Sequence, residues 1–480
     1  MIRVLSVASE CVPLVKTGGL ADVVGALPAA LKGAGVEMRV LLPGYPAVLA
    51  ALEGSEVLEE VDAFGGRLRL LAGRAAGLDL LVLEAPHLYD RPGGPYLDPQ
   101  GRDWADNDAR FAALSWTGAR IGAQGAGGWM PDVLHGHDWQ AGLMPVYLKD
   151  AGHDRPTVLT VHNIAFHGLT AAARMGALRL PAWAFHPDGF EFYGQISALK
   201  AGLVHAWRIT AVSPTFAREL ATPEHGAGLD GVIRSRGGDV RGILNGIDTA
   251  SWDPMNDPAI SGFKSPNGKA ANRSALMAEC GLVEAGGPLA VVVSRLSDQK
   301  GLDLLLAALP AFLAQGGQLA LLGSGDRRLE HAWLAAAEAH PGQVSVKIGY
   351  DEALSHRFYA GADAVLVPSR FEPCGLTQMY GLRYGAIPVV ARTGGLADTV
   401  IHANAAALTA GCATGLVHDP QSVPALEEAL RQLCALHAQP AAFRQLQKNA
   451  MKHKVGWEAS APLYAALYAR LADSHATEKA

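Results

Sequence analysis

Arginine and lysine side chains occur in loops where a phosphate could bind. Arg295 and Lys300 lie in the segment Ser294–Gly301, which follows an apolar run and precedes a helical pattern. Cations at the start of a helix oppose its dipole, so this placement favours an anionic ligand. Open α/β sheets also hold diphosphates at the carboxyl ends of their strands. We therefore expect Arg295 and Lys300 to bind a diphosphate, against the alternative of two ordinary surface charges.

A second basic loop, Lys16-Thr17-Gly18-Gly19, stands between the first apolar run and a helical pattern that begins near Leu20. Glycines at Gly18 and Gly19 let backbone N–H groups approach an anion at a helix N-terminus. Lys16 adds a full positive charge. The alternative is a tight turn beside a solvated lysine, and this loop alone does not decide between the two.

The segment Ser369–Gln378 brings a carboxylate to the end of another apolar run. We expect Glu372 to bind sugar hydroxyls, with phosphate oxygens held by the start of the next helix at Gly375, Leu376 and Thr377. A helix-capping acid is the alternative for Glu372. For Cys374 we prefer the role of a small buried apolar residue.

Histidines follow two further apolar runs, in His135-Gly136-His137-Asp138 and at His162. His-x-His-Asp is compatible with metal ligation. No further Cys, His or acidic partner recurs at suitable spacing, so polar residues that line a sugar-binding crevice are the preferred interpretation. A hydrogen-bonded core histidine remains the alternative for His162.

Two weaker signals concern nucleotide binding. Tyr350 offers an aromatic face on which a base could stack. The segment Gly226–Gly231 matches the dinucleotide fingerprint, but the preceding Thr222–His225 is not a strand. That fingerprint requires strand, turn and helix in order, so we interpret the segment as a loop and disfavour an NAD-dependent enzyme.

The elements that must position these side chains alternate strands with helices, which is typical of parallel sheets covered by helices. The apolar runs are continuous, as in strands buried on both faces. In the first half we expect strands at Val4–Ala8, Met38–Leu42, Leu78–Leu83, Val133–His135, Val158–Val161 and Ile209–Val212, with an antiparallel excursion over Glu56–Leu71 that turns at Gly65-Gly66. In the second half we expect them at Leu289–Ser294, Gln318–Leu322, Val344–Lys347, Ala364–Val367 and Ile387–Val390.

Strand signals are weakest over Thr249–Pro288, which predicts a domain boundary just before it, near Asn245. The predicted domains are residues 1–244 and 245–456, followed by a C-terminal helical segment, 457–480. The motif KTGGLADVV at Lys16–Val24 recurs as RTGGLADTV at Arg392–Val400. This echo favours two related halves, although a good strand-to-helix turn used twice would leave the same trace.

Composition excludes several classes of protein. With 49% hydrophobic and 18% charged residues, the chain can bury a large core. A net charge of −6 without a basic block argues against nucleic acid as a partner. No apolar run is long enough for a membrane span and no cleavable signal is evident. The five cysteines are scattered, so we expect reduced thiols in the cytoplasm.

Several motifs in fixed order resemble the bacterial glycogen synthase and plant starch synthase family. They are KTGGLAD, HGHDWQAGL, TVHNIAFHG, NGID, SRLSDQKGLD, SRFEPCGLTQMYGLRYG and RTGGLADTV, and the likeness runs from about residue 2 to about residue 470. It implies the GT-B architecture, an α/β fold of two Rossmann-like domains with a deep cleft between them. The C-terminal helix would cross back to the N-terminal domain, which holds the glucan.

The resemblance also implies roles. The co-substrate would be ADP-glucose and the acceptor an α-1,4-glucan, with retention of configuration. Lys16, Arg295 and Lys300 would contact the phosphates, Glu372 would bind the glucosyl unit and His162 would lie beside its ring. Asn245, Gly18 and Thr377 would be secondary donor contacts, and Asp22 and Asp138 acceptor-side ones. Many related retaining enzymes carry a second glutamate where this chain has Tyr380, so their ribose contact does not transfer.

Fixed cations aimed at the leaving phosphate would replace a divalent metal, so we expect no metal and no cofactor. The leaving phosphate would accept the proton of the acceptor hydroxyl, with Glu372 as an orienting and electrostatic group. The rival interpretations are a sucrose- or trehalose-type transferase, an oxidoreductase, a glycogen phosphorylase and a non-catalytic glucan-binding protein. Fold alone does not separate them.

Overall fold

The computed structural model describes residues 1–479, and it divides into two compact units. Unit 1 comprises Met1–Asn245 and the chain from Trp457 onward, and unit 2 comprises Gly246–Gly456. Asn245, which the sequence placed at the start of the second domain, is the last residue of the first segment of unit 1. Residue 480 of the predicted C-terminal segment lies outside the described residues.

Unit 1 is built on a nine-stranded sheet whose first seven strands are parallel. In spatial order the strands are β12 (Val240–Gly242), β11 (Arg208–Ala211), β7 (Thr157–Val161), β6 (Val133–His137), β1 (Ile2–Val7), β2 (Val36–Pro43), β5 (Leu78–Glu84), β4 (Gly66–Ala75) and β3 (Glu53–Ala63). Strands β3 and β4 are antiparallel, which confirms the predicted excursion. A small antiparallel sheet of β8 (Leu169–Ala171), β10 (Gln195–Ser197) and β9 (Glu191–Phe192) was not predicted.

Unit 2 contains a six-stranded parallel sheet. Its spatial order is β15 (Val344–Ile348), β14 (Gln318–Gly323), β13 (Leu289–Val293), β16 (Ala364–Val367), β17 (Ile387–Ala391) and β18 (Leu416–His418). Numbered along the chain this is 3-2-1-4-5-6, the Rossmann order, and β5-β2-β1-β6-β7-β11 of unit 1 follows the same order. Every predicted strand overlaps an observed one, with ends shifted by at most two residues.

The repeated motif lies at different topological positions in the two units. Counted along the chain, KTGGLADVV follows β1, the first strand of its sheet, whereas RTGGLADTV follows β17, the fifth strand of its own sheet. The units share a strand order, but the echo does not mark equivalent places in them. Its simpler interpretation, a favourable turn into a helix used twice, fits the structure better.

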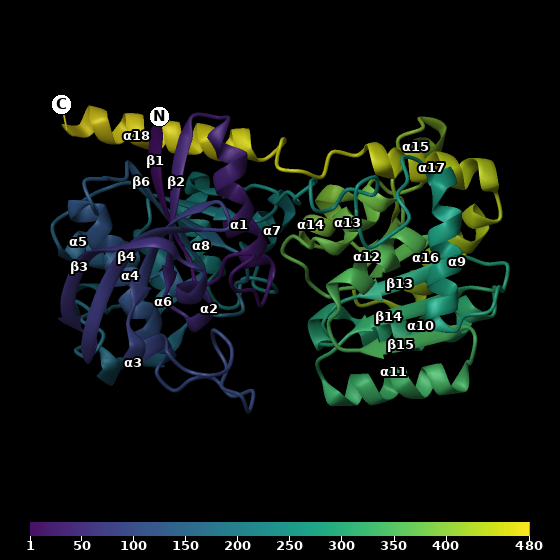
Figure 1. Ribbon diagram of the computed structural model, residues 1–480, viewed down its shortest axis with the longest axis horizontal. Helices are drawn as coiled ribbons and strands as arrows, with labels where there is room; N and C mark the ends of the chain where they lie inside the picture. The colour runs from purple at the N-terminus through teal and green to yellow at the C-terminus, as the bar shows by residue number, and fades with distance from the viewer. Residues whose placement is uncertain (480) are drawn as a thin grey trace. The chain divides into compact units, whose positions relative to one another are not determined.

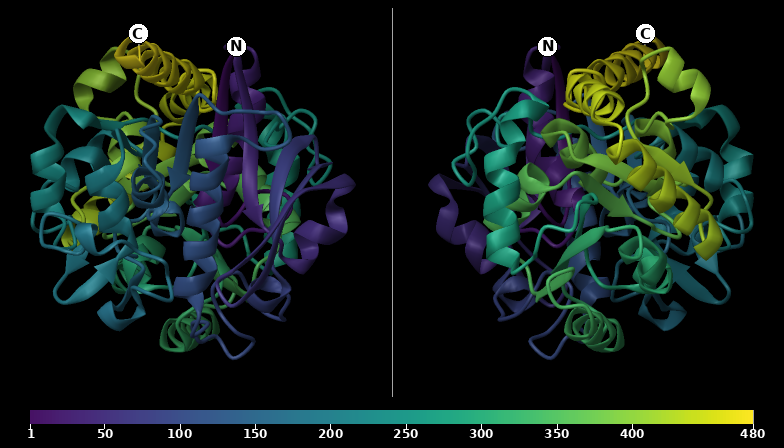
Figure 2. Two further views of the ribbon diagram at one scale, coloured as in Figure 1. Left: turned by 90° about the vertical axis from the view of Figure 1, so that its left-hand side faces the viewer. Right: turned by 90° about the vertical axis from the view of Figure 1, so that its right-hand side faces the viewer.

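Helices cover both sheets (Figure 1). In unit 1 they are α1 (Gly19–Lys32), α2 (Pro46–Ala51), α3 (Pro86–Tyr89), α4 (Asn107–Gln124), α5 (Met144–Asp150), α6 (Ala198–His205), α7 (Pro214–Glu219), α8 (Asp230–Arg236) and α18 (Ala461–Lys479). In unit 2 they are α9 (Ala270–Cys280), α10 (Leu302–Leu313), α11 (Arg327–Ala339), α12 (Glu352–Gly361), α13 (Thr377–Tyr384), α14 (Gly394–Thr399), α15 (Ala405–Thr409), α16 (Val423–His437) and α17 (Pro440–Lys452). Figure 2 shows α4, blue in its left view, crossing the sheet of unit 1, where it packs on β1, β2 and β6.

The C-terminal helix α18 packs on α1, β1 and β6 of unit 1 (Figure 1). Its buried face contributes Tyr464, Tyr468 and Leu471 to a hydrophobic cluster with Val4 and Leu27. The last helix of the chain therefore completes the core that the first strand begins. Among the described residues, no helix is long and apolar enough to cross a membrane.

A buried lysine in unit 2 gives the fold a pH-dependent stability. Lys269 is 5% exposed, and its Nζ donates to the carbonyl oxygens of Tyr359 at 2.9 Å and Tyr384 at 2.7 Å. Burial lowers the pKa of Lys269 to about 7. An unfolded lysine keeps its proton to about pH 10.4, so between these values the unfolded chain binds more protons than the folded one. The contribution of Lys269 to stability therefore rises with pH from about 7 to about 10.4.

Replacing Lys269 by methionine, which has similar length and no charge, is expected to remove this dependence. Urea unfolding at pH 7 and pH 9 measures it. From pH 7 to pH 9, the free energy of unfolding of the wild type should increase relative to that of Lys269→Met. A constant difference between the proteins would show that folded Lys269 keeps its proton.

Candidate functional site

In unit 2 the candidate residues gather where the strand order reverses. Lys300 lies in the loop after β13, and Glu372 lies in the loop after the neighbouring strand β16. Lys300 Nζ is 2.5 Å from Glu372 Oε2, and Ser369 Oγ donates to the same oxygen at 3.0 Å. The Lys300 side chain is 18% exposed and that of Glu372 9%. The carboxyl ends of strands at such a reversal are where α/β sheets bind ligands.

The two loops are tied to each other by several hydrogen bonds. Arg370 N donates to the Gln299 carbonyl at 2.9 Å, and Gln299 Nε2 donates to the Phe371 carbonyl at 3.2 Å. Gly301 has a φ of 63°, and a Cβ there would stand 2.1 Å from the Pro368 carbonyl oxygen. A side chain at Gly301 would therefore push the loops apart and separate Lys300 from Glu372.

Arg295 is exposed at the same end of β13. Among the described residues it has no ion pair or hydrogen bond from its side chain, in contrast to the paired Lys300. An uncompensated guanidinium at the same sheet edge as a largely buried Lys–Glu pair is suited to an anion that arrives from solvent. Lys300 is thus already held by Glu372, whereas Arg295 is available to bind a ligand.

The start of α13 lies at the same edge. Gly375 has a φ of 74°, and Leu376 occupies the N-cap position with no side-chain cap. Thr377 Oγ1 donates to the Val293 carbonyl at 3.5 Å, which joins α13 to the end of β13. The amides at this helix N-terminus lie where the sequence predicted phosphate contacts. Cys374 is buried, with 4% exposure, as a small packing residue should be.

The second TGGLAD motif supports Glu372, a role that the sequence did not suggest. Gly395 N donates to the carbonyls of Glu372 at 3.2 Å and Pro373 at 3.1 Å. A Cβ at Gly394 would stand 1.9 Å from the Glu372 carbonyl oxygen. Only glycine permits this approach, so α14 holds the backbone that carries Glu372. The GG pair was a visible signal, but it was interpreted as a repeat.

Two aromatic residues differ in their surroundings. Tyr350 is 72% exposed, with its hydroxyl donating to Glu352 at 3.1 Å. Its face is therefore open to solvent, and its predicted contact with a base stays a prediction. Tyr380 stacks on Trp252 with ring centroids 3.8 Å apart. At position 380 the chain therefore has an aromatic packing residue.

In unit 1 the loop after β1 is organised by Glu10, which the sequence analysis missed. The buried carboxylate of Glu10 accepts from the amides of Thr17 and Gly18, from the Thr17 hydroxyl at 2.6 Å and from the Tyr96 hydroxyl. The Gly18 amide, which was expected to face a phosphate, is thus engaged by a protein carboxylate in this structure. Helix α1 begins at the next residue, Gly19.

Lys16 and Asp22 come from the same motif and form an ion pair, with Lys16 Nζ 2.7 Å from Asp22 Oδ1. The Lys16 side chain is 42% exposed, so the pair contributes little to stability and exchanges readily with solvent. Lys16 can therefore leave Asp22 for a ligand at small cost. The structure describes each unit by itself, so it brings Lys16 together with Asp22 but does not relate it to Arg295, Lys300 or Glu372.

Three histidines lie in a row at the ends of β6 and β7. His162 Nε2 is 3.0 Å from His137 Nδ1, and the His137 ring packs in a tilted arrangement against that of His135 with centroids 4.2 Å apart. His137 Nε2 is 3.1 Å from Ser6 Oγ. Burial lowers the pKa of His162 well below its ordinary value, and the pKa of His137 falls to about 3. The imidazoles are therefore neutral at physiological pH.

Asp138 fixes the turn that follows this row. Its φ is 54°, and Oδ1 accepts from the amides of His162 at 2.6 Å and Asn163 at 3.3 Å. Burial raises the pKa of Asp138 to about 7, against the two backbone hydrogen bonds that lower it. Asp138 thus positions the His162 backbone. Asn245 is also buried, and its Oδ1 has no hydrogen-bond partner among the described residues.

Tyr468 of α18 reaches the histidine row from the far end of the sequence. Its hydroxyl is 2.7 Å from His135 Nδ1, and His135 Nε2 is 2.6 Å from Thr160 Oγ1. Among the described residues, no group of three or more His, Cys, Asp or Glu side chains is arranged to hold a metal ion.

Tyr468→Phe is expected to lower the free energy of unfolding by about 1 kcal/mol, because one buried hydrogen bond is lost and His135 Nδ1 is left unpaired. Urea denaturation measures this. The matched variant Tyr464→Phe tests whether any loss of a hydroxyl from this face of α18 has the same effect. Equal losses in the two variants would contradict a specific role for Tyr468.

Comparisons with known proteins agree in both units. The family model for the starch synthase catalytic domain matches residues 3–235, and that for glycosyl transferases group 1 matches residues 281–452. The chain is 60% identical to a glycogen synthase of Paracoccus denitrificans over 98% of this chain and 100% of the relative. The catalytic domain of starch synthase IV from Arabidopsis thaliana, solved with ADP and acarbose, is 30% identical, covers 98% of this chain and 99% of its own, and superposes with a TM-score of 0.89. A sucrose-phosphate synthase from Thermosynechococcus elongatus shares the fold at 19% identity, with a TM-score of 0.62 over 99% of this chain and 100% of its own.

Proposed function

The chain belongs to the glycogen synthase family, and we propose that it transfers glucose from ADP-glucose to the non-reducing end of an α-1,4-glucan with retention of configuration. The observation that carries the mechanism is the largely buried Lys300–Glu372 pair, with Arg295 exposed at the same sheet edge. A sucrose- or trehalose-type activity has less support, because such relatives share only the fold.

Transfer breaks the bond between the glucosyl C1 and the oxygen of the diphosphate, and it forms a bond between C1 and the O4 of the acceptor. The electron pair of the broken bond stays on the phosphate, where negative charge increases in the transition state. Lys300 and Arg295 would stabilise that charge more strongly than the charge of the bound donor, which accelerates the chemical step. The proton of the acceptor O4 passes to the leaving phosphate oxygen.

Glu372 would stabilise the positive charge that develops on the sugar. As the diphosphate leaves, positive charge develops on the glucosyl ring, and a carboxylate held by Lys300 and Ser369 can stabilise it and accept hydrogen bonds from sugar hydroxyls. His162 would lie beside the ring as a neutral imidazole, so it adds hydrogen bonding without a second positive charge. Lys16 would contact the donor phosphates after leaving Asp22.

The adenine nucleotide is proposed on the strength of the starch synthase IV relative, whose structure contains ADP and acarbose. The test is an assay of the purified protein with a glycogen primer, comparing ADP-glucose with UDP-glucose by nucleotide release and primer extension. We expect extension with ADP-glucose at a much higher kcat/KM. Extension with neither donor would overturn the proposed function, and equal use of both would overturn the donor assignment.

We further propose that the reaction needs no metal and no cofactor and takes place in the cytoplasm. Arg295 and Lys300 supply the positive charge at the diphosphate that a divalent ion supplies in other transferases. Activity in the presence of a chelator measures this. Activity that is lost with the chelator and restored by Mg²⁺ would contradict it.

A further inference from the structure

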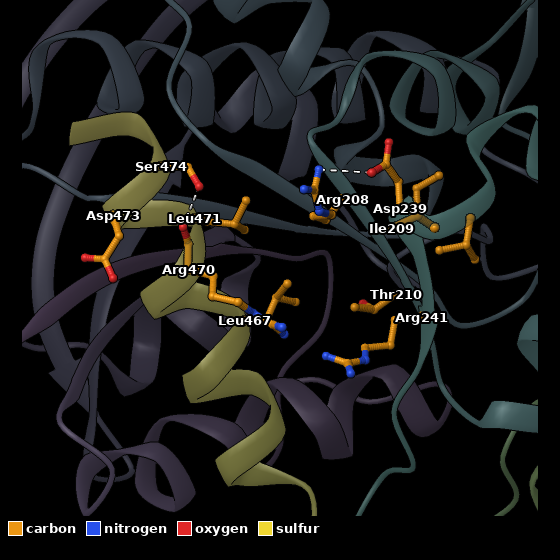
Figure 3. A pocket seen from close by; sticks show the side chains of 12 residues that line it. Arg208, Ile209, Thr210, Asp239, Arg241, Leu467, Arg470, Leu471, Asp473 and Ser474 are labelled. Atoms are coloured by element: carbon orange, nitrogen blue, oxygen red, sulfur yellow. Dashed lines mark hydrogen bonds and ion pairs between the residues drawn. The ribbon is translucent and has the colours of Figure 1, made fainter. Parts of the chain in front are cut away.

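A pocket of about 570 Å³ lies in unit 1, at the β12 edge of its nine-stranded sheet (Figure 3). One wall is formed by α18, with the exposed Arg470 beside the buried Leu467 and Leu471, and the other wall is formed by β11 and β12 at the edge of the sheet. The pocket is therefore closed by the last helix of the chain against an edge strand. None of the candidate donor-binding residues lines it.

Three arginines line the pocket, and only one of them is neutralised. Arg208 pairs with Asp239 at 3.0 Å, and Asp239 also pairs with Arg236 at 3.1 Å, so its carboxylate is fully engaged. In the described part of the chain, Arg241 and Arg470 form no ion pair. Two unpaired guanidinium groups at one pocket repel each other unless an anion lies between them.

Figure 3 shows how these side chains point. The guanidinium groups of Arg241 and Arg470 extend toward each other from the two walls, whereas the carboxylate of Asp473 points away from the pocket. Leu467 and Leu471 also line the pocket; they are 6% and 3% exposed, so each contributes a narrow apolar edge. The pocket thus combines a two-arginine anion site with an apolar lining and has room for more than a bare phosphate.

We propose that this pocket binds a small organic phosphate, whose phosphate group is bridged by Arg241 and Arg470 and whose organic part lies against the accessible edges of Leu467 and Leu471. Planar guanidinium groups are suited to bidentate contact with phosphate oxygens. The apolar lining distinguishes an organic phosphate from inorganic phosphate.

The place of the pocket in the chain gives the ligand a regulatory consequence. β12 is the last strand before unit 1 ends at Asn245, and α18 follows the return of the chain at Trp457. A ligand bridging Arg241 and Arg470 joins the two segments through which the chain leaves and re-enters unit 1. Thr210, which lines the pocket, is also hydrogen-bonded through Thr160 to His135 of the histidine row. Binding would therefore stabilise the docking of α18 beside the residues that position His162.

The test is isothermal titration calorimetry of the full-length protein with n-butyl phosphate as the probe, and with inorganic phosphate and butan-1-ol for comparison. We expect butyl phosphate to bind more tightly than inorganic phosphate, and butan-1-ol not to bind. Binding by Arg241→Ala/Arg470→Ala should be at least about tenfold weaker, since two charge-assisted contacts are lost. Arg327→Ala, which removes an exposed arginine of unit 2, should bind as the wild type does.

A second double variant shows in which site the probe binds, because the proposed donor site would also bind phosphates. In Arg295→Ala/Lys300→Ala the affinity should be unchanged, and loss of binding there would assign the probe to the donor site and overturn the proposal. Equal affinity in the wild type and Arg241→Ala/Arg470→Ala would overturn it too, as would no binding by the wild type. Arg241→Gln/Arg470→Gln replaces the alanine variant if that protein does not fold. The titration needs no glucosyl transfer, so its outcome is independent of the proposed activity.

Discussion

Lys300→Ala is expected to lower kcat for glucosyl transfer by about a hundred- to a thousandfold, or roughly 3 kcal/mol in the barrier, with a smaller change in the KM for the donor. The reason is the proposed role of Lys300, which lies in the loop after β13 and would place its charge at the phosphate that gains negative charge in the transition state. An interaction that strengthens only in the transition state affects kcat rather than KM. Steady-state kinetics with glycogen and ADP-glucose measures both constants.

Among the described residues, the variant also leaves the buried Glu372 with only Ser369 as a side-chain partner, so its fold must be checked by circular dichroism. Lys264→Ala, which removes an exposed lysine of the same unit, is the matched control and should keep full activity. Lys300→Arg should recover part of the lost rate, since it restores the charge with a different shape. A raised KM with an unchanged kcat would show that Lys300 binds the donor without contributing to the chemical step.

Apart from β15, which stands at a sheet edge, the strands that the sequence predicted individually lie inside their sheets. Segments such as Ala364–Val367 and Ile387–Ala391 are buried on both faces and are therefore continuously apolar, which makes them recognisable without any tertiary information. The missed strands β12 and β18 have three residues each and stand at sheet edges. Such strands form because a neighbouring strand offers hydrogen bonds, and a sequence window does not contain that neighbour.

The same limit applies to the candidate site. Lys300 and Glu372 could be placed at one sheet edge because each follows a predicted strand. The role of Glu10 could not be foreseen, since it depends on Tyr96 and on the fold-back of the Thr17 loop. The support that Gly394 gives to Glu372 likewise joins two distant loops.

Tertiary packing also gives the two copies of the TGGLAD motif different roles. The two TGGLAD motifs each lead into a helix, α1 and α14, so their local meaning was correct. In unit 1 the motif surrounds a carboxylate from its own loop, and in unit 2 it holds the backbone of Glu372. Local propensity therefore predicted the turn, and the neighbouring loops determine what it does.

Glu372→Gln is expected to reduce kcat by about a hundred- to a thousandfold while leaving the protein folded. The amide has the shape of the carboxylate and can still accept from Ser369, but it carries no charge to stabilise the developing positive charge on the sugar. Its loss also leaves Lys300 without its ion-pair partner. Kinetics as for Lys300→Ala measures the effect, and Glu338→Gln, at an exposed position of unit 2, is the matched control.

The mechanism separates this electrostatic role of Glu372 from that of a nucleophile. If the carboxylate attacked C1, wild-type protein incubated with ADP-glucose and no acceptor would accumulate a glucosyl group bonded to Glu372, and mass spectrometry of the peptide that contains it would reveal the added mass. We expect no such adduct, because Glu372 Oε2 is already held by Lys300 and Ser369. A carboxylate fixed in this way stabilises charge at small reorganisation cost, whereas a nucleophile would have to give up both contacts to form its bond.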